Sequence, residues 1–148
     1  MAASSDGHTV QIGVRFFERY TDEEVAAVVA HELAHTVLRH RVRLEAAGVK
    51  WGLLSEFGRN GRLFRRTETE ADLLGAALMR NAGYDPAVAV SFWRDHGGDV
   101  DGGLFRSRTH ASSKDRAAAI DAEAARIPKD AGRNWTPPLL ATRDQPLN

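Results

Sequence analysis

The five residues from His31 to His35 constrain this chain more than any other feature, because they place two histidines four positions apart in a segment with a strong helix signal. Residues four apart share one face of an α-helix, so both imidazoles can bind one metal ion. Glu32 projects about 100° round the helix from His31, where it can act on a water bound to that metal. The alternative, a core helix with two incidental histidines, leaves Glu32 as an unpaired acid beside a buried stripe.

The surrounding segment has the start and stop signals of a helix. Thr21 and Glu24 have the spacing of a capping box, and the acids after Thr21 suit the positive end of the helix dipole. Basic residues from Arg39 onward mark the other end. Apolar residues recur at helical spacing, and we expect them to dock this helix on the core: Val25, Val28, Val29, Leu33 and Val37.

A third metal ligand is expected downstream, in the segment from Thr67 to Asp72. Glu68 and Asp72 are four apart and share a helix face, whereas Glu70 points away, toward the apolar residues that follow. We therefore predict that Glu68 binds the metal and that Asp72 accepts a hydrogen bond from the free ring N–H of a ligating histidine. An isolated pair with this spacing is more often a solvated acidic face, but its position after the histidine motif favours the metal site.

The motif H-E-L-A-H, followed by R-R-T-E-T-E-A-D-L-L-G, resembles the HtpX, BepA and CAAX prenyl protease family of gluzincin zinc metallopeptidases. The resemblance covers roughly residues 9–125. It implies a zincin-like fold, with Glu68 as the third zinc ligand and Asp72 as the conserved aspartate of the family motif. The chain between His35 and Asp72 is too short for the transmembrane hairpin that some relatives insert there. Ala34 stands where the family often has glycine, a change that should be harmless.

A weaker family signature, T-H-P followed by an arginine in the next helix, is similar to Thr109-His110-Ala111 and Arg116. By this resemblance His110 is a catalytic candidate, which would either occupy the open position on zinc or donate to the oxyanion. Arg116 would lie behind the site or serve as that donor. Ala111 replaces the usual proline, so an exposed loop histidine is the alternative for His110.

Two histidines and one carboxylate form the ligand set of a catalytic zinc site, which keeps one position open for water. The expected activity is a zinc-dependent endopeptidase, in which Glu32 takes a proton from the water and returns it to the leaving amine. Protein or peptide substrates in unfolded or extended form are expected, added to the edge of a strand at Thr9–Phe17. Two alternatives stay open: a zinc-bound chaperone or scaffold without turnover, against which Glu32 argues, and an amidase with the same metal site.

Composition agrees with a small globular enzyme. The 148 residues suit one domain, and the 20 basic and 20 acidic residues give no net charge, which argues against a nucleic-acid partner. The absence of cysteine excludes disulfides and cysteine-ligated zinc. No apolar run is long enough for a transmembrane segment, and residues 1–7 do not form a signal sequence. Because family members are commonly exported or membrane-anchored, we expect the catalytic part of a longer exported, periplasmic or envelope-associated protein.

The expected fold is α+β and mainly helical, with a small sheet and an H-E-x-x-H helix. Residues 1–128 should form the catalytic domain and residues 129–148 an extended C-terminal tail. Outside the histidine helix, the expected elements are a strand at 9–17, helices at 43–57, 63–82, 86–96 and 113–127, a turn at 58–61 and a glycine-rich surface loop at 95–108.

Overall fold

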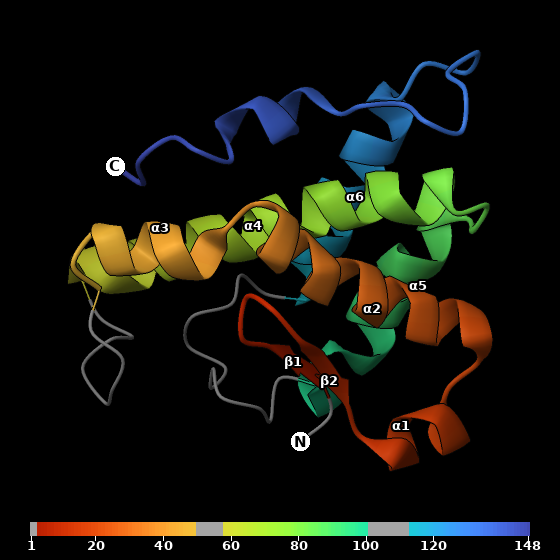
Figure 1. Cartoon of the computed structure of the whole chain (residues 1–148). Helices are drawn as coiled ribbons and strands as arrows, with labels where there is room; N and C mark the ends of the chain where they lie inside the picture. The colour runs from red at the N-terminus through yellow and green to blue at the C-terminus, as the bar shows by residue number, and fades with distance from the viewer. Residues whose placement is uncertain (1–2, 50–57, 101–112) are drawn as a thin grey trace.

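The computed structural model of the chain describes residues 3–49, 58–100 and 113–148. These residues are mainly helical with one small sheet, which confirms the expected fold class (Figure 1). The elements are β1 (Ala3–Ser5), β2 (Val10–Ile12), α1 (Val14–Arg19), α2 (Asp22–Val37), α3 (His40–Ala46), α4 (Gly58–Asn81), α5 (Pro86–Val100), α6 (Ser113–Arg126) and the 3-10 helix η1 (Pro138–Thr142). Strands β1 and β2 form an antiparallel hairpin in which Ser4 faces Gln11.

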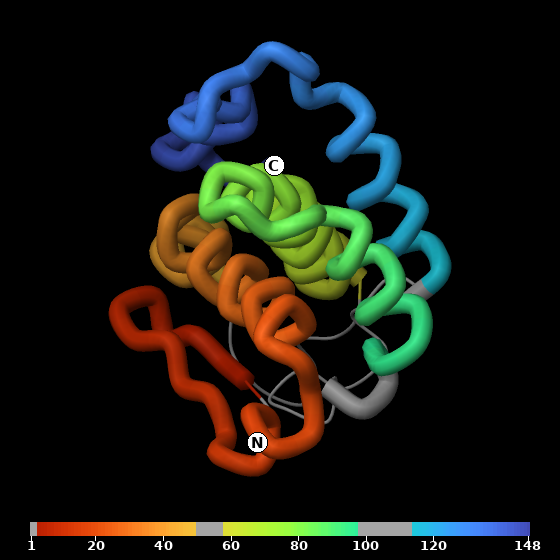
Figure 2. Tube along the Cα trace, turned by 90° about the vertical axis from the view of Figure 1, so that its right-hand side faces the viewer, coloured from red at the N-terminus to blue at the C-terminus, as the bar shows by residue number. Residues whose placement is uncertain are grey.

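Helices α2 and α4 pack against each other at the centre of the molecule, and α2 lies between α4 and the hairpin (Figure 2). Their interface is built from small residues, because Ala30, Ala34 and Ala71 are buried there. Gly75 of α4 lies so close to α2 that a Cβ on it would be 3.3 Å from the backbone nitrogen of His31. The helix docks through these small side chains, whereas Leu33, which was expected on the buried face, is exposed.

Helices α1, α5 and α6 complete the main core around α2 and the second half of α4. Phe92 and Trp93 of α5 are buried there with Phe16 of α1 and Ile120 of α6. Phe16, Tyr20 and Phe92 form edge-on and tilted ring contacts, with centroids 4.5 to 6.1 Å apart. Pro86 begins α5, at the predicted residue, and the Asp85 carboxylate accepts a hydrogen bond from the Ala87 amide.

The strand predicted at 9–17 is wrong beyond Ile12. The chain leaves the extended conformation at Gly13, which precedes the first residue of α1. Helix α1 buries Phe16 against Tyr20 and Phe92, and this aromatic contact outweighs the alternating pattern that suggested a strand.

The elements between α2 and α4 also differ from the prediction. Helix α3 begins at His40, because Arg39 adopts a left-handed conformation (φ 54°) that ends the first helix and redirects the chain. The predicted turn at 58–61 is instead the first turn of α4, which begins at Gly58. Helix α5 continues to Val100, into the segment predicted as a loop from residue 95. Residues 50–57 and 101–112, including His110 and Ala111, lie outside the described part of the chain.

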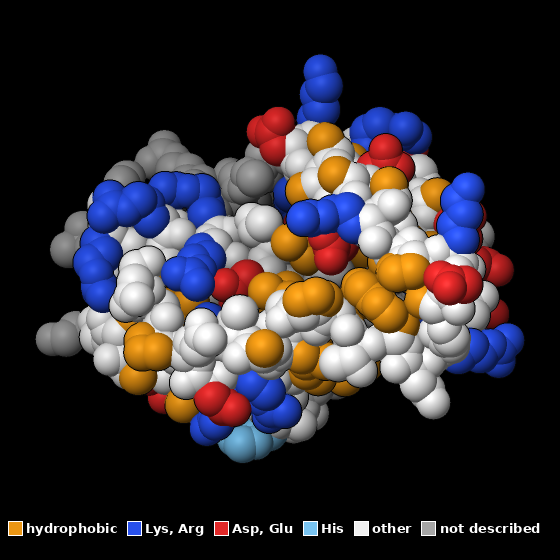
Figure 3. All heavy atoms as spheres, turned by 90° about the horizontal axis from the view of Figure 1, so that it is seen from above, with side chains coloured by type: hydrophobic (Ala, Val, Ile, Leu, Met, Phe, Trp, Pro, Cys, Tyr) orange, Lys and Arg blue, Asp and Glu red, His pale blue; other side chains and the backbone are white. Residues whose placement is uncertain are grey.

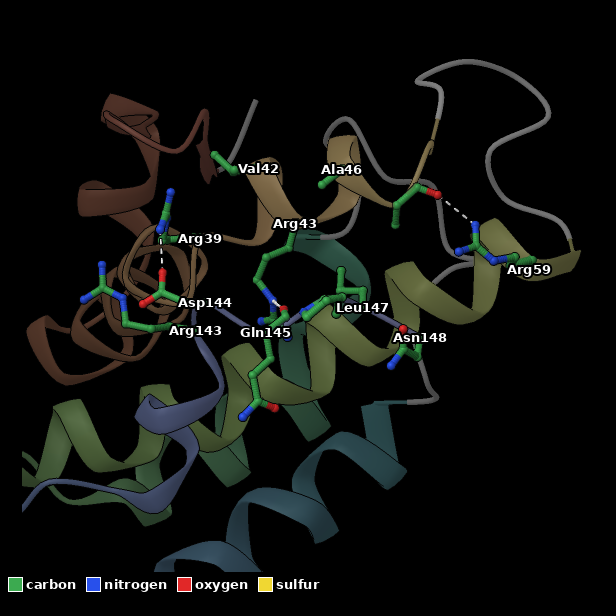
Figure 4. Close-up of a pocket in the computed structure, with 12 residues that line it drawn as sticks. Arg39, Val42, Arg43, Ala46, Arg59, Arg143, Asp144, Gln145, Leu147 and Asn148 are labelled. Carbon is green, nitrogen blue, oxygen red and sulfur yellow. Dashed lines mark hydrogen bonds and ion pairs between the residues drawn. The ribbon is translucent and has the colours of Figure 1, made fainter.

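The C-terminal segment is packed on the molecule and contains η1, contrary to the extended tail that was predicted. Arg80 donates to the carbonyl oxygens of Ala131 and Gly132, and Asn81 donates to that of Trp135. Leu147 is buried beside Leu44 and Phe64. Figure 4 shows this last stretch lying between α3 and the start of α4. Basic side chains gather over this end of the molecule (Figure 3).

Among the described residues, no helix combines the length and the apolar character that crossing a membrane requires.

Candidate metal centre

The nitrogen and oxygen atoms of three predicted ligands converge between α2 and α4. His31 and His35 of α2 bring their Nε2 atoms to 3.1 Å from each other. Each Nε2 lies 3.3 Å from a different carboxylate oxygen of Glu68 on α4. His31 and Glu68 are buried, and His35 is partly exposed, so the cluster is open on the His35 side.

The spacing of these atoms fits a tetrahedral zinc ion. Nitrogen and oxygen ligands at about 2.0–2.1 Å from such an ion lie about 3.3 Å from one another. Each Nε2 is paired with a different oxygen of Glu68, so the separations of 3.1, 3.3 and 3.3 Å join four atoms, and one ligand atom from each of the three residues lies within 4.8 Å of the others. Two imidazole nitrogens and one carboxylate are also the donor set of catalytic zinc sites with a fourth, open position.

The outer nitrogen of His31 is held by a buried ion pair. Its Nδ1 lies 2.9 Å from Oδ1 of Asp72, which was predicted to take this place. Arg116 of α6 donates to both Asp72 oxygens, at 2.8 and 2.9 Å, and its guanidinium stacks on Trp93 with its central carbon 3.7 Å from the ring centroid. Both Asp72 and Arg116 are buried. The Nε and Nη2 atoms of Arg116 are bonded to Asp72, which places this side chain behind the carboxylate. A role for Arg116 as donor to the oxyanion stays a prediction.

The carboxylates of Asp72 and Glu68 favour a positive charge at His31. Burial lowers the pKa of His31, but its hydrogen bonds to Asp72 and Glu68 outweigh burial and raise the pKa to about 10. Burial raises the pKa of Asp72, but the charge and hydrogen bonds of Arg116 outweigh it and lower that pKa below its usual value. The negative charges of Asp72 and Glu68 favour both a proton on His31 and a divalent cation bound to it, so a proton and a metal ion compete for the His31 nitrogen.

A second polar cluster, which the sequence analysis missed, lies on the outer side of His35. Nδ1 of His35 is 2.8 Å from Nδ1 of His40, and Nε2 of His40 is 3.1 Å from Glu70. Arg43 and Arg66 also donate to Glu70, at 2.8 and 2.9 Å. Glu70 is buried, as is Leu74 on the same side of α4, but its carboxylate is surrounded by donors that the sequence analysis did not foresee. The available signals were a third histidine after the motif and an acid between Glu68 and Asp72.

Burial and hydrogen bonding shift both titrating groups of this second cluster. Burial is the main cause that lowers the pKa of His40 to about 4, despite its bond to Glu70. Burial raises the pKa of Glu70, but hydrogen bonds from His40, Arg43 and Arg66 outweigh it and lower the pKa to about 2. At neutral pH His40 is therefore neutral and Glu70 is ionised.

A cavity of about 280 Å³ opens beside the metal ligands. Its lining includes His35, His40 and Glu68 together with Ser5 and Gln11 of the hairpin. Ser5 is joined to α2 by a hydrogen bond of 2.9 Å to Thr36, which fixes the hairpin beside the ligands. Glu32 follows His31 on α2 and is partly exposed. The place of His110 in this arrangement stays a prediction.

Comparison with known proteins agrees with this arrangement. The model of peptidase family M48 matches residues 3–124. The chain is 36% identical to the mitochondrial metalloendopeptidase OMA1 of Schizosaccharomyces pombe, over 68% of this chain and 36% of that protein. It is 33% identical to the protein of the same name from Arabidopsis thaliana, over 68% of this chain and 24% of that protein. No solved structure matches the chain significantly.

The chain thus spans 36% or less of the length of these relatives. The matched family confirms the resemblance to gluzincin metallopeptidases at the family level, while the relatives carry a different name from HtpX, BepA and the CAAX prenyl proteases. A family model that matches residues 3–124 covers both helices of the metal centre. The chain therefore belongs to peptidase family M48.

Proposed function

We propose that this chain is the catalytic domain of a zinc-dependent endopeptidase. The observation that supports this most directly is the convergence of His31, His35 and Glu68 with separations of 3.1 to 3.3 Å. Family membership and the metalloendopeptidase names of the two relatives support the same reaction class. Zinc held by these three residues would supply a Lewis acid that polarises the scissile carbonyl and makes a water more acidic.

Within this proposal, Glu32 is the general base. It accepts a proton from the attacking water and delivers that proton to the leaving amine, so that one carboxylate serves both steps. Its partial exposure beside buried His31 suits this role, because the group must meet both water and substrate. Asp72 and Arg116 hold His31 in place. His110 is proposed either to occupy the open position on zinc in a resting state or to donate to the oxyanion during turnover.

The substrate is proposed to be an extended or unfolded peptide segment. The cavity beside Glu68 is bordered by the β-hairpin, so a peptide can lie along the hairpin with its scissile bond next to the ligands. The strands are only three residues long, so backbone pairing offers few hydrogen bonds. We therefore expect selection for extended conformation more than for particular side chains.

The test combines metal analysis with cleavage of an unstructured protein such as reduced casein. Wild type should hold about one zinc per chain and cleave, and both properties should disappear with a chelator. Glu32→Gln should retain zinc and lose cleavage, whereas Glu68→Ala should lose zinc. Cleavage by Glu32→Gln at the wild-type rate would refute the assigned base. Zinc binding without cleavage of any peptide would favour the scaffold, and hydrolysis of simple amides alone would favour the amidase.

An exported or envelope-associated location is retained as a proposal from the family resemblance alone. The two matched relatives are named as mitochondrial proteins. Fractionation of the source cells, with an antibody against this chain, would test the proposal, and recovery in the cytosolic fraction would refute it.

A further inference from the structure

The second metal ligand, His35, is bonded on its outer side to a chain of groups that ends in two arginines. Its Nδ1 faces Nδ1 of His40 at 2.8 Å, and Nε2 of His40 faces Oε2 of Glu70 at 3.1 Å. Oε2 also accepts from Arg43, and Oε1 accepts from Arg66. The groups come from α2, α3 and α4, so three helices meet behind this one ligand.

The donors around Glu70 determine where the protons lie. An ionised carboxylate only accepts hydrogen bonds, so Nε2 of His40 must donate to Glu70. A neutral imidazole with its proton on Nε2 presents a lone pair at Nδ1, so Nδ1 of His35 must be the donor of the 2.8 Å bond. A His35 ring that binds a metal with its proton on Nδ1 does so through the lone pair of Nε2, the atom that faces His31 and Glu68.

We propose that His40 and Glu70 are positioning residues, which fix the tautomer and the ring orientation of metal ligand His35. This inference rests on the proposed function, since it assigns His35 to the metal. The arrangement parallels that of His31, whose Nδ1 is held by Asp72 and, behind it, by Arg116. Each histidine ligand thus has a carboxylate of α4 behind it, directly for His31 and through His40 for His35. Such outer partners orient the ring and raise the basicity of the ligating nitrogen.

Arg43 and Arg66 set the direction of the hydrogen bonds that run from Glu70 through His40 to His35, because they keep Glu70 an acceptor. Arg43 is buried, and its Nε donates to the carbonyl oxygen of Gln145 (Figure 4). Its Nη1 donates to Glu70. Replacing Glu70 by glutamine would put an amide nitrogen where an acceptor is needed, because His40, Arg43 and Arg66 all donate there. With the amide oxygen turned to His40 and Arg43, the amide nitrogen faces the Nε of Arg66; in the opposite orientation it faces His40 and favours a proton on Nδ1 of that ring. In either orientation the charge that holds the Nε2 proton of His40 is lost.

The first experiment measures the affinity for zinc by competition with a chromophoric chelator. His40→Phe keeps a ring in place and removes the acceptor, and Glu70→Gln removes the charge; each should weaken binding by about 10–100-fold. Because Glu70 acts through His40, the double variant should bind zinc no more weakly than His40→Phe alone. Glu45→Gln is the matched control, since Glu45 also lies on α3 and its side chain is half-exposed in a pair with Arg41. It should bind like wild type.

Glu70→Gln could fail to fold, because Arg43 is buried beside it. His40→Phe leaves the bonds between Glu70 and both arginines intact, so it keeps the proposal testable; circular dichroism establishes that it is folded. The second measurement is ¹⁵N NMR of histidine-labelled, zinc-loaded wild type. It should show His40 neutral with its proton on Nε2 and His35 with its proton on Nδ1.

Three results would overturn the inference: wild-type zinc affinity in folded His40→Phe, a proton on Nδ1 of His40, or additive losses in the double variant. In each case wild type could still bind zinc and lose cleavage on Glu32→Gln, so the proposed function would stand. Failure of wild type to bind zinc would overturn both together.

Discussion

Gly75 lies at a close approach of α4 to α2, the two helices that carry the candidate metal ligands, and replacing it by alanine should push these two helices apart. The added Cβ would lie 3.3 Å from the backbone nitrogen of His31 and 3.4 Å from its Cα. Ordinary contacts between heavy atoms are about 3.5–4.0 Å long. Because both atoms belong to the backbone of α2, neither can rotate away, and α2 and α4 must separate by a few tenths of an ångström.

Two opposing terms decide the effect of Gly75→Ala on stability. Alanine is favoured over glycine in a helix interior by about 1 kcal/mol. Inserting a methyl group into a packed interface costs about 1–3 kcal/mol. We expect the packing term to win, so the free energy of unfolding should fall by about 1 kcal/mol. A metal site tolerates deviations of only about 0.2 Å, so zinc affinity should fall by about tenfold.

The measurements are urea unfolding with a chelator present and a competition titration with zinc. Thr69→Ala is the control, because Thr69 is an exposed residue of α4 and its change to alanine also raises helix propensity. It should leave zinc affinity close to that of wild type and raise the free energy of unfolding by no more than about 0.7 kcal/mol. If Gly75→Ala were about 1 kcal/mol more stable than wild type and bound zinc equally well, the reasoning from close approach would be refuted.

Two further predictions concern the groups behind the ligands. Arg116→Met should lower the free energy of unfolding by about 3–5 kcal/mol in urea titrations, because it leaves the buried Asp72 carboxylate without its two arginine bonds. Arg116→Lys should lower it less, and Arg116→Met as stable as wild type would contradict this account. The second concerns pH: burial lowers the pKa of His40 from 6.5 to about 4, so below pH 6.5 the unfolded chain takes up a proton that the folded chain refuses. In urea titrations with chelator present, the free energy of unfolding of wild type should therefore fall by up to about 3 kcal/mol relative to that of His40→Phe as the pH drops from 6.5 to 4. If the two free energies ran parallel with pH, burial would not have this effect on His40.

The shared faces of the candidate metal ligands could be predicted because they depend on helix geometry. His31 and His35 are four apart on one helix, and Glu68 and Asp72 are four apart on another, so each pair shares a face whatever the rest of the fold does. The capping box at Thr21 and Glu24, present in the structure, fixed the start of the first helix in the same local way. Period and capping therefore predicted each pair on its own helix, and the order of the two motifs together with the family resemblance predicted that the pairs meet.

The contact of His35 with His40, and through it with Glu70, could not be predicted in this way, because it depends on a break in the helix. On a continuous helix, residues five apart point in directions about 140° apart, so His40 would face away from His35. The left-handed conformation of Arg39 ends α2 and returns the chain, which brings the two Nδ1 atoms to 2.8 Å. A left-handed arginine is uncommon and has no sequence signature of the kind that glycine provides. The hydrogen bonds of Glu70 escaped prediction for the same reason, because His40 and Arg43 follow the break at Arg39.

The C-terminal residues escaped prediction because their partners lie far away in the sequence. Proline-rich composition suggested an extended tail, yet Leu147 is buried and the carbonyl oxygen of Gln145 accepts from Nε of Arg43. The same arginine donates through Nη1 to Glu70. A long side chain held at two points loses less freedom when it binds a third group, so the C-terminal segment helps to order the donor that Glu70 requires. The last residues of the chain thus contribute to the metal centre through packing, although none of them approaches the ligands.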